Sequence, residues 1–170
     1  GMYSGIEEMS ADGERAMTLR VITGAASGRV AHTALRLARE QRGRCTVVHK
    51  ASVLRQTDGL FRRDVREVAA EYPDVALDEL LVDTAALRLA QQPEAFDVLV
   101  TTNLFGDILS DLAAAHIGGL GVAASANVGG GKGLFEPVHG SAPDIAGRGI
   151  ANPTATFLAA VLMLRHLGAH

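Results

Sequence analysis

The sequence predicts an α/β fold, and three observations lead to that prediction. Short apolar runs of strand length alternate along the chain with stretches whose apolar residues recur at helical spacing. Hydrophobic residues make up 48% of the 170 residues and charged residues only 21%, which is typical of a globular protein. The length is that of one domain or two small ones. Alternation of this kind is typical of a sheet covered by helices.

Taken in order, residues 3–26 predict a hairpin or arm that ends in a strand at 19–23. Ser27 then predicts the cap of a helix that continues to about Glu40, because apolar residues follow it at helical spacing. Pro73 marks the end of a further helix. The expected strands that follow are 44–50, 80–82 and 96–101, and the expected helices are 59–72, 84–91 and 106–116.

Glycine-rich sequence begins at residue 118 and predicts a crossing between two domains, 1–117 and 118–170. The glycine-rich segment 129–133 is similar to a phosphate-binding P-loop. It does not fit that motif, because Lys132 is followed by Gly133 instead of Ser or Thr. We therefore expect a flexible loop there. Asn152 and Pro153 predict the start of a last helix, which ends at about residue 167.

Charge and composition exclude several classes of function. A formal net charge of −3 provides no basic surface for nucleic acid, and aromatic residues make up only 4%. No apolar run reaches the roughly 18 residues that a bilayer requires, so no membrane is expected. Cys45 is the only cysteine and lies in an apolar run, which predicts a buried, inert thiol. These features favour a cytoplasmic protein.

Asp107 and Asp111 lie four residues apart in an apolar-periodic segment, so a helix places both carboxylates on one face. Carboxylates that close repel each other unless a positive charge lies nearby, and Mg²⁺ or Mn²⁺ prefers such oxygen ligands. The alternative is an acidic first turn that complements the helix dipole. Asp83 follows the expected strand 80–82 and either caps the next helix or supplies a third metal carboxylate.

Two further positions are candidates for chemistry. Lys50 ends an apolar strand, where α/β sheets place functional groups, although such a lysine is often only a solvated charge. The segment 136–147 is polar and bounded by glycine, and it contains His139, Ser141 and Asp144. It fits either a loop that wraps a nucleotide or an ordinary turn.

Taken together, these segments resemble the β-decarboxylating dehydrogenases, the family of isocitrate, isopropylmalate, homoisocitrate and tartrate dehydrogenases. The matching stretches are YSGIEE at 3–8, VVHKASVLRQTDGLF at 47–61, TTNLFGDILSDLAA at 101–114 and FEPVHGSAPDIAGRGIANPTAT at 135–156. The resemblance covers nearly the whole chain and is closest to the homoisocitrate or NAD-type isocitrate members. It implies a partial dehydrogenase fold, with the small dimerisation domain and the C-terminal part of the large domain.

The resemblance also implies roles for individual residues. Asp107 and Asp111 would bind Mg²⁺ or Mn²⁺ with Asp83 of the other subunit of a homodimer. Lys50, which would also be contributed across the dimer, would take part in proton transfer from the substrate hydroxyl. Tyr3 would protonate the enol that remains after loss of CO₂. The residues expected to hold the adenosine half of NAD are His139, Gly140, Ser141, Ala142, Asp144, Ile145 and Asn152. A carboxylate at Asp144 would repel the 2′-phosphate of NADP.

The family's chain has a long part before the matching tyrosine, and this part contains arginines that grip the substrate carboxylates. That part has no counterpart in this sequence, so we expect the chain to be the later part of something longer. Two functions follow as alternatives. The chain belongs to an NAD-dependent enzyme that oxidatively decarboxylates a 2-hydroxy acid bearing a β-carboxylate, or it is an inactive, truncated dimeric remnant that at most binds metal.

Overall fold

The computed structural model describes residue 1 and residues 4–169, and it divides into two compact units, Gly1–Leu109 and Ser110–His170. The expected α/β class is confirmed, because parallel strands alternate with helices along the first unit. The division at residues 117 and 118 into a small domain and a partial large domain stays a prediction. No helix in the described part of the chain is long and apolar enough to cross a membrane.

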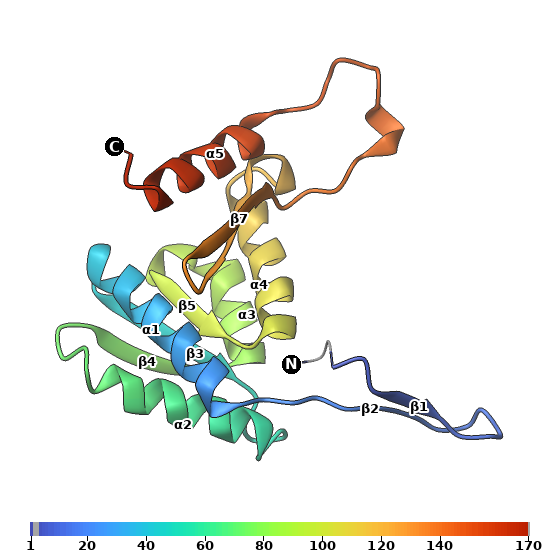
Figure 1. The fold of residues 1–170 in the computed structure, drawn as a ribbon, viewed down its shortest axis with the longest axis vertical. Coiled ribbons are helices and arrows are strands. Elements are labelled where there is room, and N and C mark those ends of the chain that lie inside the picture. Colours follow the sequence, from blue (N-terminus) through green and yellow to red (C-terminus); the bar gives the residue numbers. More distant parts are fainter. Residues whose placement is uncertain (2–3, 170) are drawn as a thin grey trace. The chain divides into compact units, whose positions relative to one another are not determined.

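The first unit is built on a parallel three-stranded sheet in the order β4-β3-β5 (Figure 1). Its strands are β3 (Arg44–His49), β4 (Ala76–Leu81) and β5 (Val98–Thr101). The central strand β3 is buried from Cys45 to His49 and pairs Val47 with Glu79 on one side and with Val100 on the other. Because all three strands run the same way, their carboxyl ends lie along one edge of the sheet.

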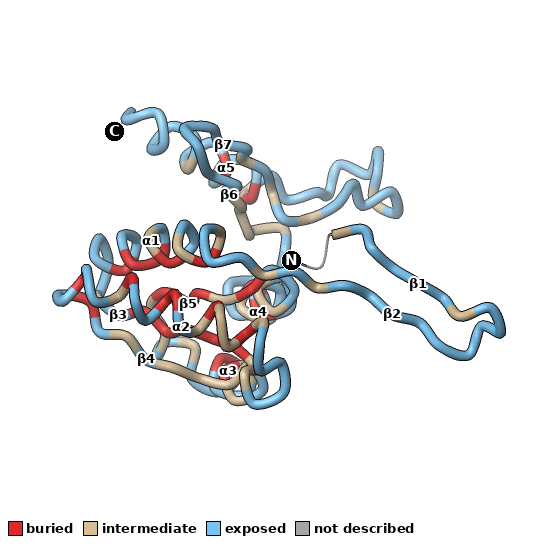
Figure 2. Tube along the Cα trace, turned by 60° about the horizontal axis from the view of Figure 1, so that its bottom comes forward, coloured by how far each residue is buried: buried red, intermediate tan, exposed pale blue. Residues whose placement is uncertain are grey.

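Helices α1 (Gly24–Glu40) and α2 (Thr57–Ala69) pack together over one face of this sheet. Leu35 of α1 and Val65 of α2 are fully buried against Cys45 and Val47 of β3, and Figure 2 shows this buried layer in red. Helix α3 (Val82–Gln91) packs against β3 and β4, with Ala85 and Leu89 buried. Helix α4 (Asn103–His116) follows β5.

The N-terminal residues form an exposed hairpin of β1 (Glu7–Met9) and β2 (Ala16–Thr18), as the sequence predicts (Figure 2). The expected strand at 19–23 is wrong. Leu19 donates its N–H to the carbonyl of Ile6, but residues 19–23 pair with no strand as a ladder. Thr23 instead caps α1 by accepting the N–H of Ala26 at 3.4 Å.

The predicted cap at Ser27 is therefore also wrong. Ser27 lies inside α1, is buried, and donates its hydroxyl to the carbonyl of Thr23 at 3.0 Å. The other predicted helices and strands of this unit are present, with ends shifted by a few residues, as is usual at helix termini.

The second unit consists of an antiparallel hairpin of β6 (Ala124–Gly129) and β7 (Lys132–Pro137) that packs against helix α5 (Thr154–His166). The flexible loop expected at 129–133 is wrong. Gly130 and Gly131 have φ of 58° and 74° and form the two-residue turn, whereas Lys132 and Gly133 belong to β7. Two left-handed residues match the right-handed twist of the strands that they join.

Helix α5 begins one residue after the predicted Asn152-Pro153 start. Asn152 nevertheless supplies the capping group, because its Oδ1 accepts the N–H of Thr154 at 3.0 Å and the Thr154 hydroxyl at 2.7 Å. Between β7 and α5 the chain runs as an exposed loop that contains one short 3₁₀ turn, Pro143–Ile145.

Candidate active site

The carboxyl edge of the β4-β3-β5 sheet gathers the candidate residues of the first unit. Lys50 directly follows β3, Asp83 lies in the first turn of α3 after β4, and α4 begins two residues after β5. Ligands of open α/β sheets bind outside the carboxyl ends of the strands. The topology of three adjacent strands thus places the lysine and one predicted carboxylate at the edge where such sheets bind ligands.

Lys50 and Asp83 form an ion pair, with 2.5 Å between Nζ and Oδ1. The hydrogen bond from the Lys50 ammonium is the main reason that the pKa of Asp83 lies below its usual value. Asp83 is not the N-cap residue of the next helix, because Leu81 occupies that position and Asp83 lies in the first turn of α3. Lys50 is 28% exposed and Asp83 61% exposed, so both groups are accessible to a ligand.

Asp107 and Asp111 lie on α4, one turn apart, and both are exposed. Two carboxylates at this spacing fit a hard cation such as Mg²⁺, which is usually held by one or two carboxylates together with water and substrate oxygens. No group of three or more metal-ligating side chains occurs among the residues that the structure describes. Within the first unit Asp83 lies against Lys50.

The predicted cofactor residues lie along the exposed loop between β7 and α5. Ala142 has φ 43°, and among the described residues it is the one non-glycine with a left-handed backbone. Such a conformation costs about 1–3 kcal/mol and tends to occur at functional sites. His139 bonds through Nδ1 to the carbonyl of Gly140 at 2.9 Å, whereas Ser141 and Asp144 are exposed. The loop offers backbone and carboxylate groups that fit a nucleotide.

A buried ion pair that the sequence did not predict lies beside Lys50. Asp58, at the start of α2, is fully buried and pairs with Arg20, with 2.6 Å between Oδ1 and Nη1. Its second oxygen accepts the backbone N–H of Lys50 at 2.6 Å. In the sequence, Asp58 lies directly before the helix expected at 59–72, and Arg20 falls in the stretch predicted as a strand. The quoted stretch 47–61 contains Asp58, but nothing in it indicates burial.

A second unpredicted cluster surrounds Glu79 of β4. The buried His49 approaches Glu79 with 3.0 Å between Nε2 and Oε1, and its Nδ1 accepts the N–H of Ala51 at 3.0 Å. Because Nδ1 accepts this bond, the proton of the neutral ring lies on Nε2. Arg62 and Arg66 of α2 both lie 2.6 Å from the Glu79 carboxylate.

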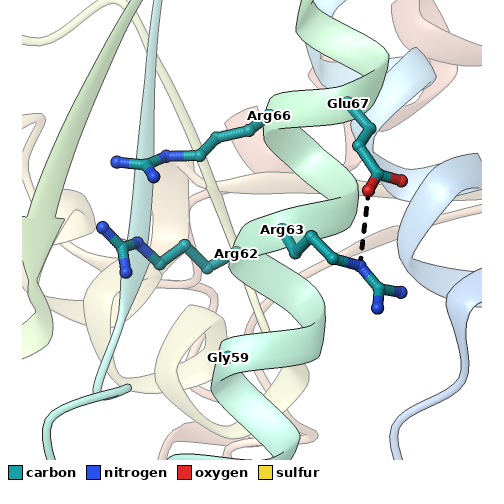
Figure 3. Close-up of a pocket in the computed structure, with 5 residues that line it drawn as sticks. All are labelled: Gly59, Arg62, Arg63, Arg66 and Glu67. Atoms are coloured by element: carbon teal, nitrogen blue, oxygen red, sulfur yellow. Dashed lines mark ion pairs between the residues drawn. The ribbon is translucent and has the colours of Figure 1, made fainter.

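A hollow on α2 is lined by Gly59, Arg62, Arg63, Arg66 and Glu67 (Figure 3). Figure 3 shows Arg62 and Arg66 pointing away from Arg63, which pairs with Glu67 at 3.5 Å. The arginines do not converge, and acidic residues partner them. This hollow includes neither Lys50 nor any predicted metal ligand, so it is not the site of the predicted chemistry.

The structure describes Cys45 but not Tyr3. Cys45 is fully buried, and burial raises the pKa of its thiol to about 11, which agrees with the prediction of an inert thiol. Tyr3, the predicted proton donor, lies outside the described residues.

The fold and this edge define a class of protein, the open α/β proteins with a lysine and a carboxylate at the carboxyl edge of a parallel sheet. The model of the isocitrate/isopropylmalate dehydrogenase family matches residues 1–170. The chain belongs to the isocitrate/isopropylmalate dehydrogenase family.

Individual relatives agree with this assignment. The chain is 54% identical over 173 residues to 3-isopropylmalate/3-methylmalate dehydrogenase of Methanocaldococcus jannaschii, covering 99% of this chain and 52% of the relative. It is 52% identical to the alpha subunit of mitochondrial NAD isocitrate dehydrogenase of Bos taurus, covering 99% of this chain and 46% of the relative. The chain thus spans about half the length of these curated relatives.

A solved structure is similar throughout the chain. Isocitrate dehydrogenase from Methylococcus capsulatus superposes with a TM-score of 0.93 at 52% identity, covering 99% of this chain and 51% of that one. The predicted family and fold are therefore confirmed.

Proposed function

We propose that this chain carries the lysine, the carboxylates and the adenosine loop of an NAD-dependent β-decarboxylating dehydrogenase. Its substrate would be a 2-hydroxy acid with a β-carboxylate, homoisocitrate or isocitrate. The observation that carries the proposal is the Lys50–Asp83 pair at the carboxyl edge of three parallel strands. The names of the relatives include both isocitrate and isopropylmalate dehydrogenases, which supports the reaction class more than the choice of substrate.

In this proposal Lys50 holds and moves a proton at the substrate hydroxyl, because its ammonium is accessible and donates a hydrogen bond to the Asp83 carboxylate. Tyr3 is the proposed donor to the enol carbon. Asp107 and Asp111 of one chain, with Asp83 of a second chain, would hold Mg²⁺ or Mn²⁺. When bound, the metal would polarise the ketone and NAD would accept the hydride.

The proposed nucleotide site is the loop between β7 and α5. Exposed backbone groups at Gly140, Ser141 and Ala142 support it, because such groups can bind a phosphate or the adenine edge. Asp144 would accept hydrogen bonds from the ribose hydroxyls, with Ile145, His139 and Asn152 around the adenosine. A homodimer in the cytoplasm completes the proposal, because its site uses residues of two chains.

The test is NADH formation by the purified chain with Mg²⁺ and four substrates: isocitrate, homoisocitrate, isopropylmalate and tartrate. We expect Lys50→Ala to lower the rate on the accepted substrate about 10²–10⁴-fold, the range of general acid–base catalysis. Lys132→Ala is the matched control, because Lys132 is the only other lysine and lies exposed on β7.

Equal losses in the two lysine variants would contradict the role of Lys50. Absence of turnover on all four acids, with metal binding retained, would favour the alternative of a remnant that binds metal without hydride transfer.

A further inference from the structure

The turn that carries Lys50 is held by buried polar groups on both sides. Asp58 accepts the N–H of Lys50 at 2.6 Å, and His49 accepts the N–H of Ala51 at 3.0 Å. The carbonyl of Lys50 accepts the N–H groups of Val53 and Leu54 at 2.9 and 2.8 Å. The backbone at Lys50 is therefore fixed while its side chain extends to its partner carboxylate.

Arg20 connects this turn to the strand end and helix beside it. Its guanidinium donates to Asp58 through Nη1 at 2.6 Å and to the hydroxyl of Thr102, after β5, through Nη2 at 2.8 Å. Its Cζ also lies 5.6 Å from the ring centroid of Phe105 on α4. The Arg20 side chain is 13% exposed and the Asp58 side chain 0% exposed, so water competes little for these bonds.

A buried ion pair is weak evidence for a contribution to stability, because removing both charges from water costs about as much as their attraction returns. What this pair adds is geometry. One carboxylate fixes the Lys50 amide, and the planar guanidinium fixes that carboxylate against the end of β5 at the same time. Both oxygens of Asp58 are used, since one accepts the Lys50 amide at the end of β3 and the other accepts the Arg20 guanidinium.

We propose that Arg20 and Asp58 are positioning residues, which hold the turn that carries Lys50 against the end of β5. The functional meaning of this inference rests on the proposed function, in which Lys50 moves a proton at the substrate hydroxyl. The placement of Lys50 itself can be measured without metal, cofactor or substrate.

The sequence provides a direct probe, because Lys50 and Lys132 are its only lysines. Lysine labelled with ¹³C at Cε therefore gives two NMR signals, and the exposed Lys132 in the other unit is the internal reference. Asp83→Asn removes the partner of Lys50 and establishes how far, and in which direction, the Lys50 signal moves when its ammonium is released.

We expect Asp58→Asn to move the Lys50 signal in the same direction as Asp83→Asn and to leave the Lys132 signal unchanged. An asparagine offers one acceptor where Asp58 uses two, so either the Lys50 amide or Arg20 loses its bond. Thr102→Val removes only the second bond of Arg20, and we expect a smaller shift of the same sign. Asp74→Asn is the control, because it breaks the exposed Arg39–Asp74 pair of the same unit.

A Lys50 signal that stays at its wild-type position in folded Asp58→Asn would overturn the proposal. An equal shift in Asp74→Asn would also overturn it, because the effect would then be general loosening. If Asp58→Asn loses its circular dichroism spectrum, Thr102→Val decides, and an unmoved Lys50 signal there rejects the positioning role. A shifted Lys50 signal in a chain without turnover would support the positioning while the proposed function fails.

Discussion

The partly buried carboxylate of Glu79 contacts His49, Arg62 and Arg66. Burial alone would raise its pKa, but the hydrogen bond from His49 and the charges of Arg62 and Arg66 together lower it. A carboxyl with a lowered pKa in the folded state stabilises that state above its unfolded pKa. The contribution is lost as the pH falls through the folded-state pKa.

We predict that Glu79→Gln lowers the free energy of unfolding at neutral pH by about 1–3 kcal/mol, the range for a lost hydrogen bond to a charged group. The difference from wild type is expected to shrink as the pH falls below about 4.3, the ordinary Glu pKa, because wild-type Glu79 then becomes protonated. Urea denaturation at a series of pH values from neutral to acidic measures both effects.

Asp78→Asn provides the matched control on the same strand, because the Arg44–Asp78 pair is about half exposed on both sides. Exposed pairs contribute only about 0–1 kcal/mol, so this variant is expected to stay close to wild type at every pH. A loss in Glu79→Gln that is the same in acid as at neutral pH would show that the charge of Glu79 is not what stabilises the fold.

Residues that bond within one element or end a strand could be predicted from the sequence, and residues that bond across the fold could not. The strand end before Lys50 predicts a functional position, and the apolar run around Cys45 predicts a buried thiol. Arg20 reaches Asp58 across 38 positions, and His49 reaches Glu79 across 30. Nothing local in the sequence indicates such partners, because burial of a charged residue depends on the assembled sheet and helices.

At the scale of elements, the β6–β7 hairpin shows what glycine does in this chain. Gly131 lies in the turn with φ 74°, whereas Gly129 ends β6, has no positive φ and pairs with Lys132. A Cβ at either position meets no heavy atom within 4 Å. The two glycines therefore differ in backbone conformation and not in the space around them.

We predict that Gly131→Ala destabilises the second unit by about 1–2 kcal/mol, the cost of a left-handed backbone for an L-residue. Gly129→Ala is expected to change its stability by no more than about 1 kcal/mol, and in the stabilising direction, because alanine has less freedom to lose in a strand. Thermal unfolding of the two variants measures the contrast. Equal effects would mean that the left-handed turn is not what requires glycine here.

This hairpin also explains why one element was mispredicted. Four glycines in the five residues 129–133 mask the alternation that normally predicts a strand, and two of them form the turn that pairs β6 with β7. In the first unit the central strand β3 is predicted because its apolar run is continuous, as expected for a parallel strand buried on both faces. Only the apolar end of β4 is predicted, because Asp78 and Glu79 interrupt its apolar residues. Helix α1 begins before its predicted cap because Thr23 and Ser27 both resemble caps, and only Ser27 becomes buried.

At the scale of the whole molecule, the arrangement of acidic residues bears on the proposed dimer. Asp83 is paired with Lys50 in its own chain. The proposed metal site takes Asp107 and Asp111 from one chain and Asp83 from another, so it requires two copies. By light scattering we expect twice the chain mass of 17.8 kDa.

Mixing of variants tests this sharing directly. We predict that Asp83→Asn and Asp107→Asn each abolish binding of Mn²⁺. When the two variants are co-expressed, random pairing makes about half of the dimers mixed. Each mixed dimer has one site with all three carboxylates and one site that lacks two of them, so we expect about a quarter of the wild-type number of sites to bind Mn²⁺. Titration calorimetry with Mn²⁺ counts the restored sites.

The matched control is co-expression of Asp107→Asn with Asp111→Asn. Both carboxylates belong to α4 of the same chain, so every site in every dimer lacks one of them and no binding is expected to return. Recovery in the first mixture alone identifies a site shared between chains. Recovery in neither mixture, or a monomeric mass, would contradict the shared site, because the carboxylates that bind the metal would then have to come from one chain.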